Sequence, residues 1–154
     1  MPRRRPTRQG EPAHLVLDNE ALGQVCRGQL SPPLAAALEA VVATAGRALL
    51  PMSVVVERCF DPAVPGAAAA NHLLRIAYDD ELTRPRAVEA GRLRIGVRQG
   101  ASVVDAHVAA AALALIRHHG GTATVATSDV GDIERLLDAS DDTGTRAAVF
   151  TQAL

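Results

Sequence analysis

The chain contains no lysine and little cysteine. All 16 of its positively charged side chains are arginines. A P-loop needs a lysine on the phosphates and a Schiff-base enzyme needs an amine, so both kinds of site are excluded. The usual receiver and haloacid-type phosphotransfer sites also use a lysine and are excluded with them. Cys26 and Cys59 stand far apart without a CxxC motif, which excludes a disulfide scaffold and a cysteine-rich zinc site.

Aromatic residues and long apolar runs are scarce as well. One Tyr, two Phe and no Trp exclude base stacking on aromatic side chains as a main mode of nucleic-acid recognition. No run of 18 apolar residues occurs, and no apolar stretch follows the basic N-terminus as a secretory signal requires. We therefore expect a soluble, cytoplasmic protein with no membrane partner. A hydrophobic content of 48% in 154 residues is typical of one globular domain.

Charge is unevenly distributed along the chain. The net charge is −1, but outside the first twelve residues the chain has 12 arginines against 16 acids. The other four arginines are Arg3, Arg4, Arg5 and Arg8. This Pro-rich start predicts a flexible basic leader over residues 1–12, followed by one domain over residues 13–154. The leader is either a solvated arm or an arm that contacts RNA phosphates without reading their sequence.

Short apolar runs alternate with helical patterns along the rest of the chain. Strands are expected over residues 14–17, 48–50, 122–127 and 147–150. Helices are expected over residues 19–28, 32–45, 54–57, an alanine-rich segment through 73–76, 85–99, 102–119 and 130–138, with a polar break at 79–81. The valines at 54–56 suit a strand or a helix, and Ser53 as an N-cap favours the helix. This alternation predicts a single α/β domain with a central, mostly parallel sheet and helices on both faces.

Two of the expected strands end on an aspartate. LVLD ends at Asp18 and TVATSD ends at Asp129. Ligands of an open parallel sheet bind outside the carboxyl ends of its strands. Two carboxylates at that edge repel one another unless a cation lies between them, so the pair predicts a site for a hard metal ion. The alternative for each residue alone is the N-cap of the following helix.

Three further acids lie in apolar surroundings or near this pair. Glu57 follows three valines, Asp105 begins an apolar helix, and Asp132 comes three residues after Asp129. Their alternatives are ordinary: Asp105 caps its helix or favours its positive end, Glu57 pairs with an arginine, and Asp132 is a solvated first-turn acid. His107 lies two residues from Asp105, so the two diverge on a helix, and we interpret it as a core histidine.

Four segments in order, LVLDNEAL, SVVVERC, VVDAHVAAAA and VATSDVGDIERL, resemble the acidic motifs of PIN-domain ribonucleases, especially the VapC-type toxins of bacterial toxin–antitoxin pairs. The resemblance covers residues 13–152. It implies a PIN-like fold and a metal-dependent endoribonuclease that cuts RNA to leave a 5′-phosphate and a 3′-hydroxyl. The implied catalytic and metal-binding residues are Asp18, Glu57, Asp105 and Asp129, with Asp132 as a further metal ligand. Glu20 departs from the family pattern, which more often has small hydroxylic or amide residues there.

The resemblance also implies cofactors and partners. These are Mg²⁺ or Mn²⁺, an RNA substrate (tRNA, rRNA or mRNA), a cognate antitoxin and a second copy of the chain in a homodimer. Metal-assisted hydrolysis of a phosphodiester suits such a set of carboxylates. The alternative is a non-catalytic PIN-fold module that binds RNA or a protein. A nuclease acting on structured DNA is a third reading, which the short chain disfavours.

Overall fold

A five-stranded, all-parallel sheet forms the centre of the computed structural model, which describes residues 10–58, 72, 75–98 and 100–154. Its strand order is β3-β2-β1-β4-β5. The strands are β1 (Ala13–Leu17), β2 (Ala48–Pro51), β3 (Tyr78–Asp80), β4 (Thr122–Thr127) and β5 (Val149–Ala153). The central strand β1 is almost fully buried, which explains its continuous apolar run.

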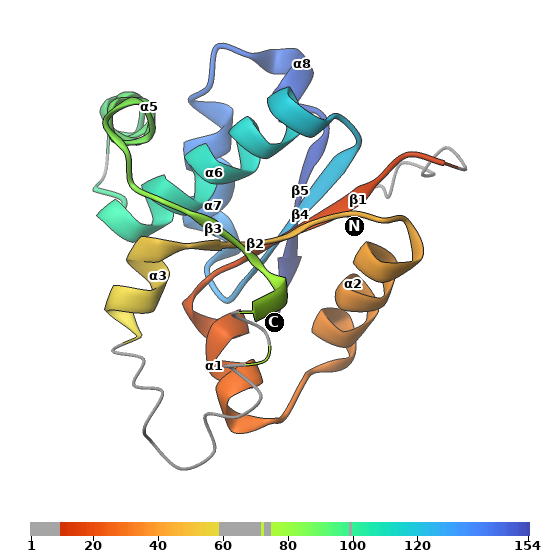
Figure 1. Cartoon of the computed structure of the whole chain (residues 1–154). Helices are drawn as coiled ribbons and strands as arrows, with labels where there is room; N and C mark the ends of the chain where they lie inside the picture. Colours follow the sequence, from red (N-terminus) through yellow and green to blue (C-terminus); the bar gives the residue numbers. More distant parts are fainter. Residues whose placement is uncertain (1–9, 59–71, 73–74, 99) are drawn as a thin grey trace.

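Helices cover both faces of the sheet (Figure 1), as the sequence predicts. α1 (Asn19–Arg27) and α2 (Pro32–Ala43) lie on one face, and α6 (Val103–His119) and α7 (Val130–Asp138) lie on the other. The remaining described helices are α3 (Met52–Glu57), α5 (Arg84–Gly96) and α8 (Thr143–Arg146). Every residue of α6 from 106 to 116 is buried, because the sheet, α5 and α7 surround it. Its many alanines allow this close packing.

Glycines end two helices as expected. Gly28 after α1 and Gly120 after α6 have φ angles of 64° and 65°, positive values that glycine adopts without steric cost. Among the described helices, none is long and apolar enough to cross a membrane. Residues 1–9 and the centre of the expected alanine-rich helix lie outside the described residues. The division between leader and domain therefore stays a prediction.

The expected polar break at residues 79–81 is wrong, because Tyr78–Asp80 forms the edge strand β3. Its backbone pairs with β2, with Leu49 opposite Tyr78 and Pro51 opposite Asp80. A polar strand is tolerated here because His107 and Arg86 hydrogen-bond the Asp80 carboxylate. The hydrophobic pattern of a segment depends only on its own residues, whereas His107 and Arg86 come from elsewhere in the chain. The pattern therefore does not predict this strand.

Two other boundaries also differ from the sequence prediction. The last strand begins at Val149 instead of 147, because the short helix α8 precedes it. Helix α3 begins directly after Pro51, so Ser53 lies inside the helix and does not cap it. The Ser53 hydroxyl instead lies 2.8 Å from Nδ1 of His107. A local capping pattern is therefore overridden by a long-range hydrogen bond.

Candidate metal centre

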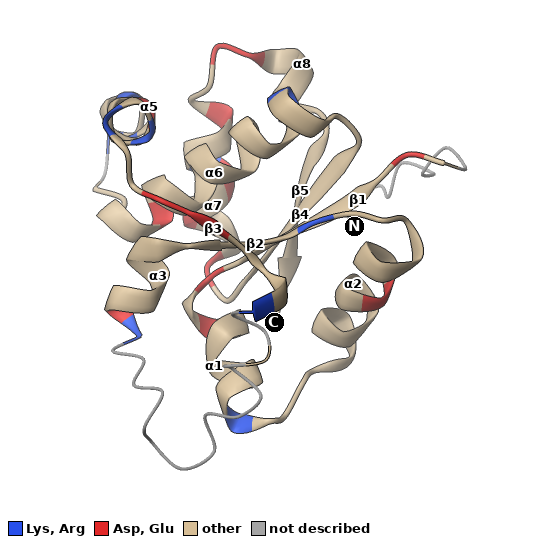
Figure 2. Cartoon of the chain, viewed as in Figure 1, with Lys and Arg blue, Asp and Glu red and all other residues tan. Residues whose placement is uncertain are grey.

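Three of the five predicted acids come together at one edge of the sheet. Carboxylate oxygens of Asp105, Asp129 and Asp132 all lie within 4.8 Å of one another. Asp129 follows β4, Asp132 lies in the first turn of α7, and Asp105 lies in the first turn of α6. Figure 2 shows the acidic segments that gather on this side of the sheet. The carboxyl ends of parallel strands thus bring acids from separate segments together.

Each of these acids lies at the N-terminus of a helix. The Asp129 carboxylate accepts a hydrogen bond from the N–H of Asp132 at 3.2 Å. The Ser102 hydroxyl accepts from the N–H of Asp105 at 2.9 Å and donates to its carboxylate at 2.7 Å. The partial positive charge of two helix N-termini offsets part of the repulsion among the carboxylates. Capping and clustering are therefore compatible, although the sequence presents them as alternatives.

Asp18 lies beside this group but outside it. The residue is 7% exposed at the end of β1, and its carboxylate accepts from the N–H of Ala21 at 3.1 Å as the N-cap of α1. The Thr127 hydroxyl lies near the Asp18 carboxylate and favours its ionised form, which lowers its pKa. The same hydroxyl accepts from the N–H of Asp129 at 2.9 Å. Thr127, fully buried at the end of β4, thus connects Asp18 with Asp129.

Thr127 is a site residue that sequence analysis misses. Its only signal is its place, directly before Ser128 and Asp129 at the end of a strand, where an inward hydroxyl reaches both neighbouring carboxylates. Burial raises the pKa of the Asp18 carboxyl above its ordinary value. The Thr127 hydroxyl and the backbone N–H groups of Ala21, Glu20 and Ser128 oppose this shift. A buried carboxylate with a raised pKa gains from a nearby cation.

Glu57 and Glu20 occupy different positions from these residues. Glu57 is exposed at the last position of α3 and is outside the group of three acids, so its role as a ligand stays a prediction. Glu20 pairs with Arg27 at 2.9 Å. Asp18 lies before the first residue of α1, and Arg27 is the last residue of this helix. The ion pair between Glu20 and Arg27 therefore directs the Glu20 side chain away from the acidic group.

The donor set fits a hard divalent cation. Oxygen ligands from carboxylates are those that Mg²⁺ and Mn²⁺ prefer. One carboxylate has a competing partner, since Asp132 forms an ion pair with Arg135. His107 is fully buried and contacts Ser53 and Asp80, which agrees with its interpretation as a core histidine.

Comparisons with known proteins find solved structures with a similar fold. No family model and no curated protein sequence matches the chain. The solved structure of VapBC2 from Rickettsia felis, bound to a DNA fragment from its promoter, matches with a TM-score of 0.55 and 11% identity, covering 92% of this chain and 98% of the other. FitAcB from Neisseria gonorrhoeae matches with a TM-score of 0.54 and 15% identity, covering 90% and 96%. These likenesses show that the chain shares the fold of the two structures, which agrees with the PIN-like fold that the four acidic motifs imply.

Proposed function

We propose that the chain is a metal-dependent endoribonuclease and the toxin of a toxin–antitoxin pair. The observation that carries the proposal is the group of Asp105, Asp129 and Asp132, connected through Thr127 to the buried Asp18. Four carboxylates at one sheet edge carry an energetic cost that a divalent cation removes. The motif resemblance to VapC-type toxins and the shared fold support the assignment.

The residues have separate roles in this proposal. Asp18, Asp105, Asp129 and Asp132 hold the metal, and Glu57 is a further candidate ligand at the end of α3. When bound there, Mg²⁺ or Mn²⁺ would supply a Lewis acid for the activation of water and for charge on the scissile phosphate of RNA. Helices α6 and α7 fix the carboxylates at their first turns, so the ligands need little rearrangement. None of the carboxylates acts as a covalent nucleophile.

The test is cleavage of RNA that depends reversibly on metal. Purified protein should cut a mixed RNA substrate with Mg²⁺ or Mn²⁺, lose this activity in EDTA and regain it when excess Mn²⁺ is added. Mn²⁺ should also raise the melting temperature, because binding to the folded state alone stabilises it by mass action. RNA binding without cleavage under all these conditions would favour the non-catalytic module instead. No RNA binding and no effect of Mn²⁺ on melting would reject both.

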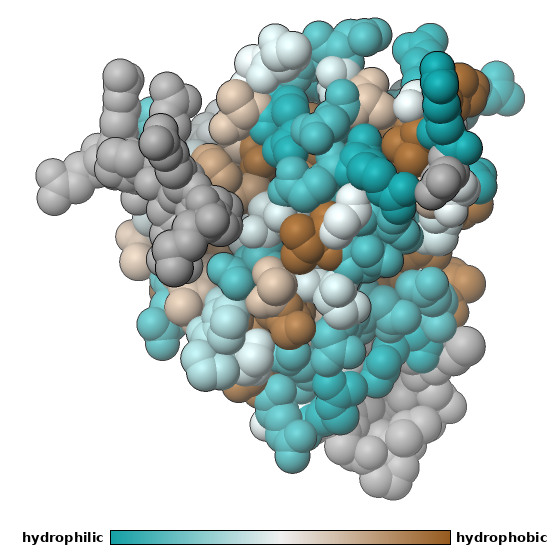
Figure 3. Space-filling model, turned by 180° about the vertical axis from the view of Figure 1, so that it is seen from behind, coloured by the Kyte–Doolittle hydropathy of each residue, from teal (hydrophilic) through white to brown (hydrophobic). Residues whose placement is uncertain are grey.

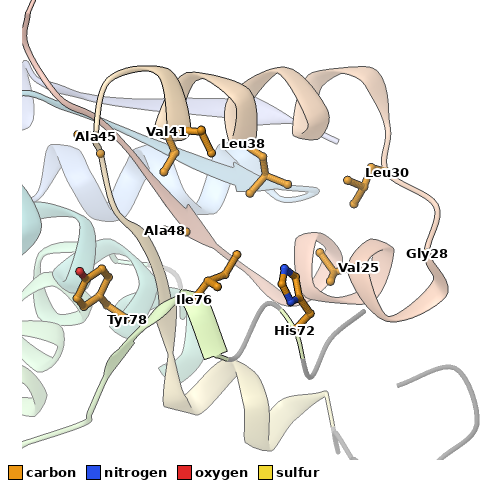
Figure 4. A pocket seen from close by; sticks show the side chains of 12 residues that line it. Val25, Gly28, Leu30, Leu38, Val41, Ala45, Ala48, His72, Ile76 and Tyr78 are labelled. Atoms are coloured by element: carbon orange, nitrogen blue, oxygen red, sulfur yellow. The ribbon is translucent and has the colours of Figure 1, made fainter. Parts of the chain in front are cut away.

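A second part of the proposal concerns the antitoxin. A pocket of about 570 Å³ lies between α1, α2, the start of β2 and the segment before β3 (Figure 4). Its lining residues are Val25, Gly28, Leu30, Leu38, Val41, Val42, Ala45, Gly46, Ala48, His72, Ile76 and Tyr78. No arginine and none of the three grouped acids is among them, so the pocket suits an apolar protein segment better than RNA. We propose that apolar side chains of the antitoxin occupy it.

Val42→Arg should weaken binding of the antitoxin by at least about tenfold, because a charged group would displace an apolar contact. Val42 is 83% exposed, so the substitution should leave folding intact. Val56→Arg on α3, where the residue is 76% exposed, is the matched control. Calorimetry with the small protein encoded beside this gene measures both. Equal affinities of the two variants for that protein would contradict the assignment of the pocket. The absence of a small protein encoded beside this gene would contradict it as well.

The homodimer remains part of the proposal. Exposed apolar side chains on α5 and its flanks provide a possible contact, and these are Leu82, Val88, Ile95 and Val103. Seen from behind in Figure 3, the surface is mostly hydrophilic, with hydrophobic residues in small groups. A dimer would therefore bury small apolar patches within a polar rim.

A further inference from the structure

Arg58 is held against helix α1 at a glycine. It follows the last residue of α3, and its N–H donates to the carbonyl of Val54 at 2.9 Å. A Cβ atom built on Gly23 would lie 2.9 Å from the Cζ and one terminal nitrogen of Arg58 and 3.0 Å from the other. The guanidinium can lie this close to α1 because residue 23 has no side chain. The two residues together fix the position of a positive charge between α1 and α3.

This half-buried guanidinium has no anionic partner among the described residues. Two other half-buried arginines and the more exposed Arg117 each contact two carboxylates, and the half-buried Arg47 lies against the Tyr78 ring. The carboxylate contacts are those of Arg86 with Asp80 and Glu89, Arg117 with Glu89 and Asp142, and Arg146 with Glu134 and Asp138. Burial removes part of the hydration of a guanidinium, and without an anionic partner this desolvation cost is not offset. In a chain with so many acids, an arginine held apart from them is suited to an anion from outside.

Arg58 contacts α1 at Gly23, in the half of the helix that begins at Asp18. Gly23 is one helical turn after Asn19, on the same face of α1, and Asp18 caps the start of that helix. The buried Oδ1 of Asn19 also has no hydrogen-bond partner in the described part of the chain. One helical turn is about 5.4 Å, close to the spacing of successive phosphates in an extended strand.

We infer that Arg58 binds a phosphate of the RNA next to the one that is cut, and that Gly23 exists at its position to admit the guanidinium. The inference rests on the proposed ribonuclease function and adds a substrate contact to it. A guanidinium binds phosphate through two parallel N–H bonds, which lysine cannot copy. It also counteracts the repulsion between a polyanion and the acidic group that must receive it.

Three variants and a control test this inference. Binding of a fluorescent single-stranded RNA is measured by anisotropy in EDTA, across a range of salt concentrations. Arg58→Gln should weaken binding about tenfold and reduce the slope of log affinity against log salt by about 0.7, the value for one phosphate contact on a single strand. Gly23→Ala should weaken binding by a similar factor with no loss of melting temperature, because alanine favours a helix more than glycine does. Arg58→Lys should retain the slope and recover only part of the affinity.

Arg47→Gln is the matched control. Arg47 lies before β2, at the amino ends of the strands, with its guanidinium 4.3 Å from the Tyr78 ring centre. Removal of this charge should leave the affinity and slope near those of the unmodified protein. Equal effects of Arg58→Gln and Arg47→Gln would overturn the inference, as would an Arg58→Gln variant that binds like the unmodified protein. A protein that binds RNA through Arg58 but never cuts it would reject the nuclease and leave the phosphate contact standing.

Discussion

Asp18→Asn should reduce metal-dependent RNA cleavage by roughly a thousandfold or more, because a lost metal ligand costs several kcal/mol of transition-state stabilisation. The same variant should melt at a higher temperature than the unmodified protein in EDTA at pH 7. Asn keeps the oxygen that caps α1 and has no charge to bury. Activity and stability of the metal-free protein should therefore change in opposite directions, and Mn²⁺ should stabilise the variant less.

The pH dependence follows from the raised pKa of Asp18. Burial disfavours the ionised carboxylate in the fold, so the unfolded chain releases this proton at a lower pH than the folded chain does. The stability that the neutral form contributes is fully present below the unfolded pKa, near 3.8, and is lost as the pH rises through the higher folded value. The stability gained by Asp18→Asn should accordingly shrink as the pH is lowered towards 3.8.

Asp141→Asn is the control, because Asp141 is exposed and lies outside the acidic group. It should alter neither cleavage nor the effect of Mn²⁺ on melting. Cleavage and melting curves in EDTA and in Mn²⁺ at several pH values measure all of these quantities. Full cleavage by Asp18→Asn would remove Asp18 from the metal centre. A lower melting temperature of the metal-free variant at pH 7 would show that the ionised carboxylate carries no net cost in the fold.

His107→Leu should destabilise the fold by about 3 kcal/mol, because two half-buried polar partners lose their hydrogen bonds to a fully buried side chain. The imidazole lies 2.8 Å from both the Ser53 hydroxyl and the Asp80 carboxylate. It therefore joins α3, α6 and β3 through the interior. For a domain of this size, such a loss lowers the melting temperature by roughly 10 °C. Denaturant unfolding measures the change in free energy directly.

The contact with Asp80 gives this prediction a pH dependence. Burial alone would raise the pKa of Asp80, but hydrogen bonds from His107 and Arg86 hold it below its ordinary value. A carboxyl with a lowered pKa contributes stability above its unfolded pKa, and this is lost as the pH falls through the folded value. The difference between His107→Leu and the unmodified protein should therefore be largest near neutral pH and smaller in acid.

Two milder substitutions separate the contacts of His107. His107→Gln keeps a donor of suitable length for Asp80 and should recover part of the stability. Ser53→Ala removes only one hydroxyl and should cost about 1 kcal/mol. If His107→Leu unfolded with the same free energy as the unmodified protein, the contacts of His107 with Ser53 and Asp80 would have no role in holding β3 to the domain.

Local sequence patterns are sufficient for much of the fold. Apolar runs of three to six residues predict β1, β2 and β4, because a strand buried on both faces needs no polar alternation. Gly28 and Gly120 mark helix ends because other residues rarely adopt their backbone conformation. Strand β3 escapes prediction because its residues are polar and its stabilising partners are distant in the sequence.

The sequence likewise predicts only part of the acidic site. The sequence by itself determines that Asp18 and Asp129 end parallel strands and start helices, because strand ends and caps depend on neighbouring residues. Only the tertiary structure decides that Asp105 joins Asp129 and Asp132, that Thr127 lies between Asp18 and Asp129, and that Arg58 lies against Gly23. These contacts depend on how helices pack across the sheet, and the side chains that meet there are far apart in the chain.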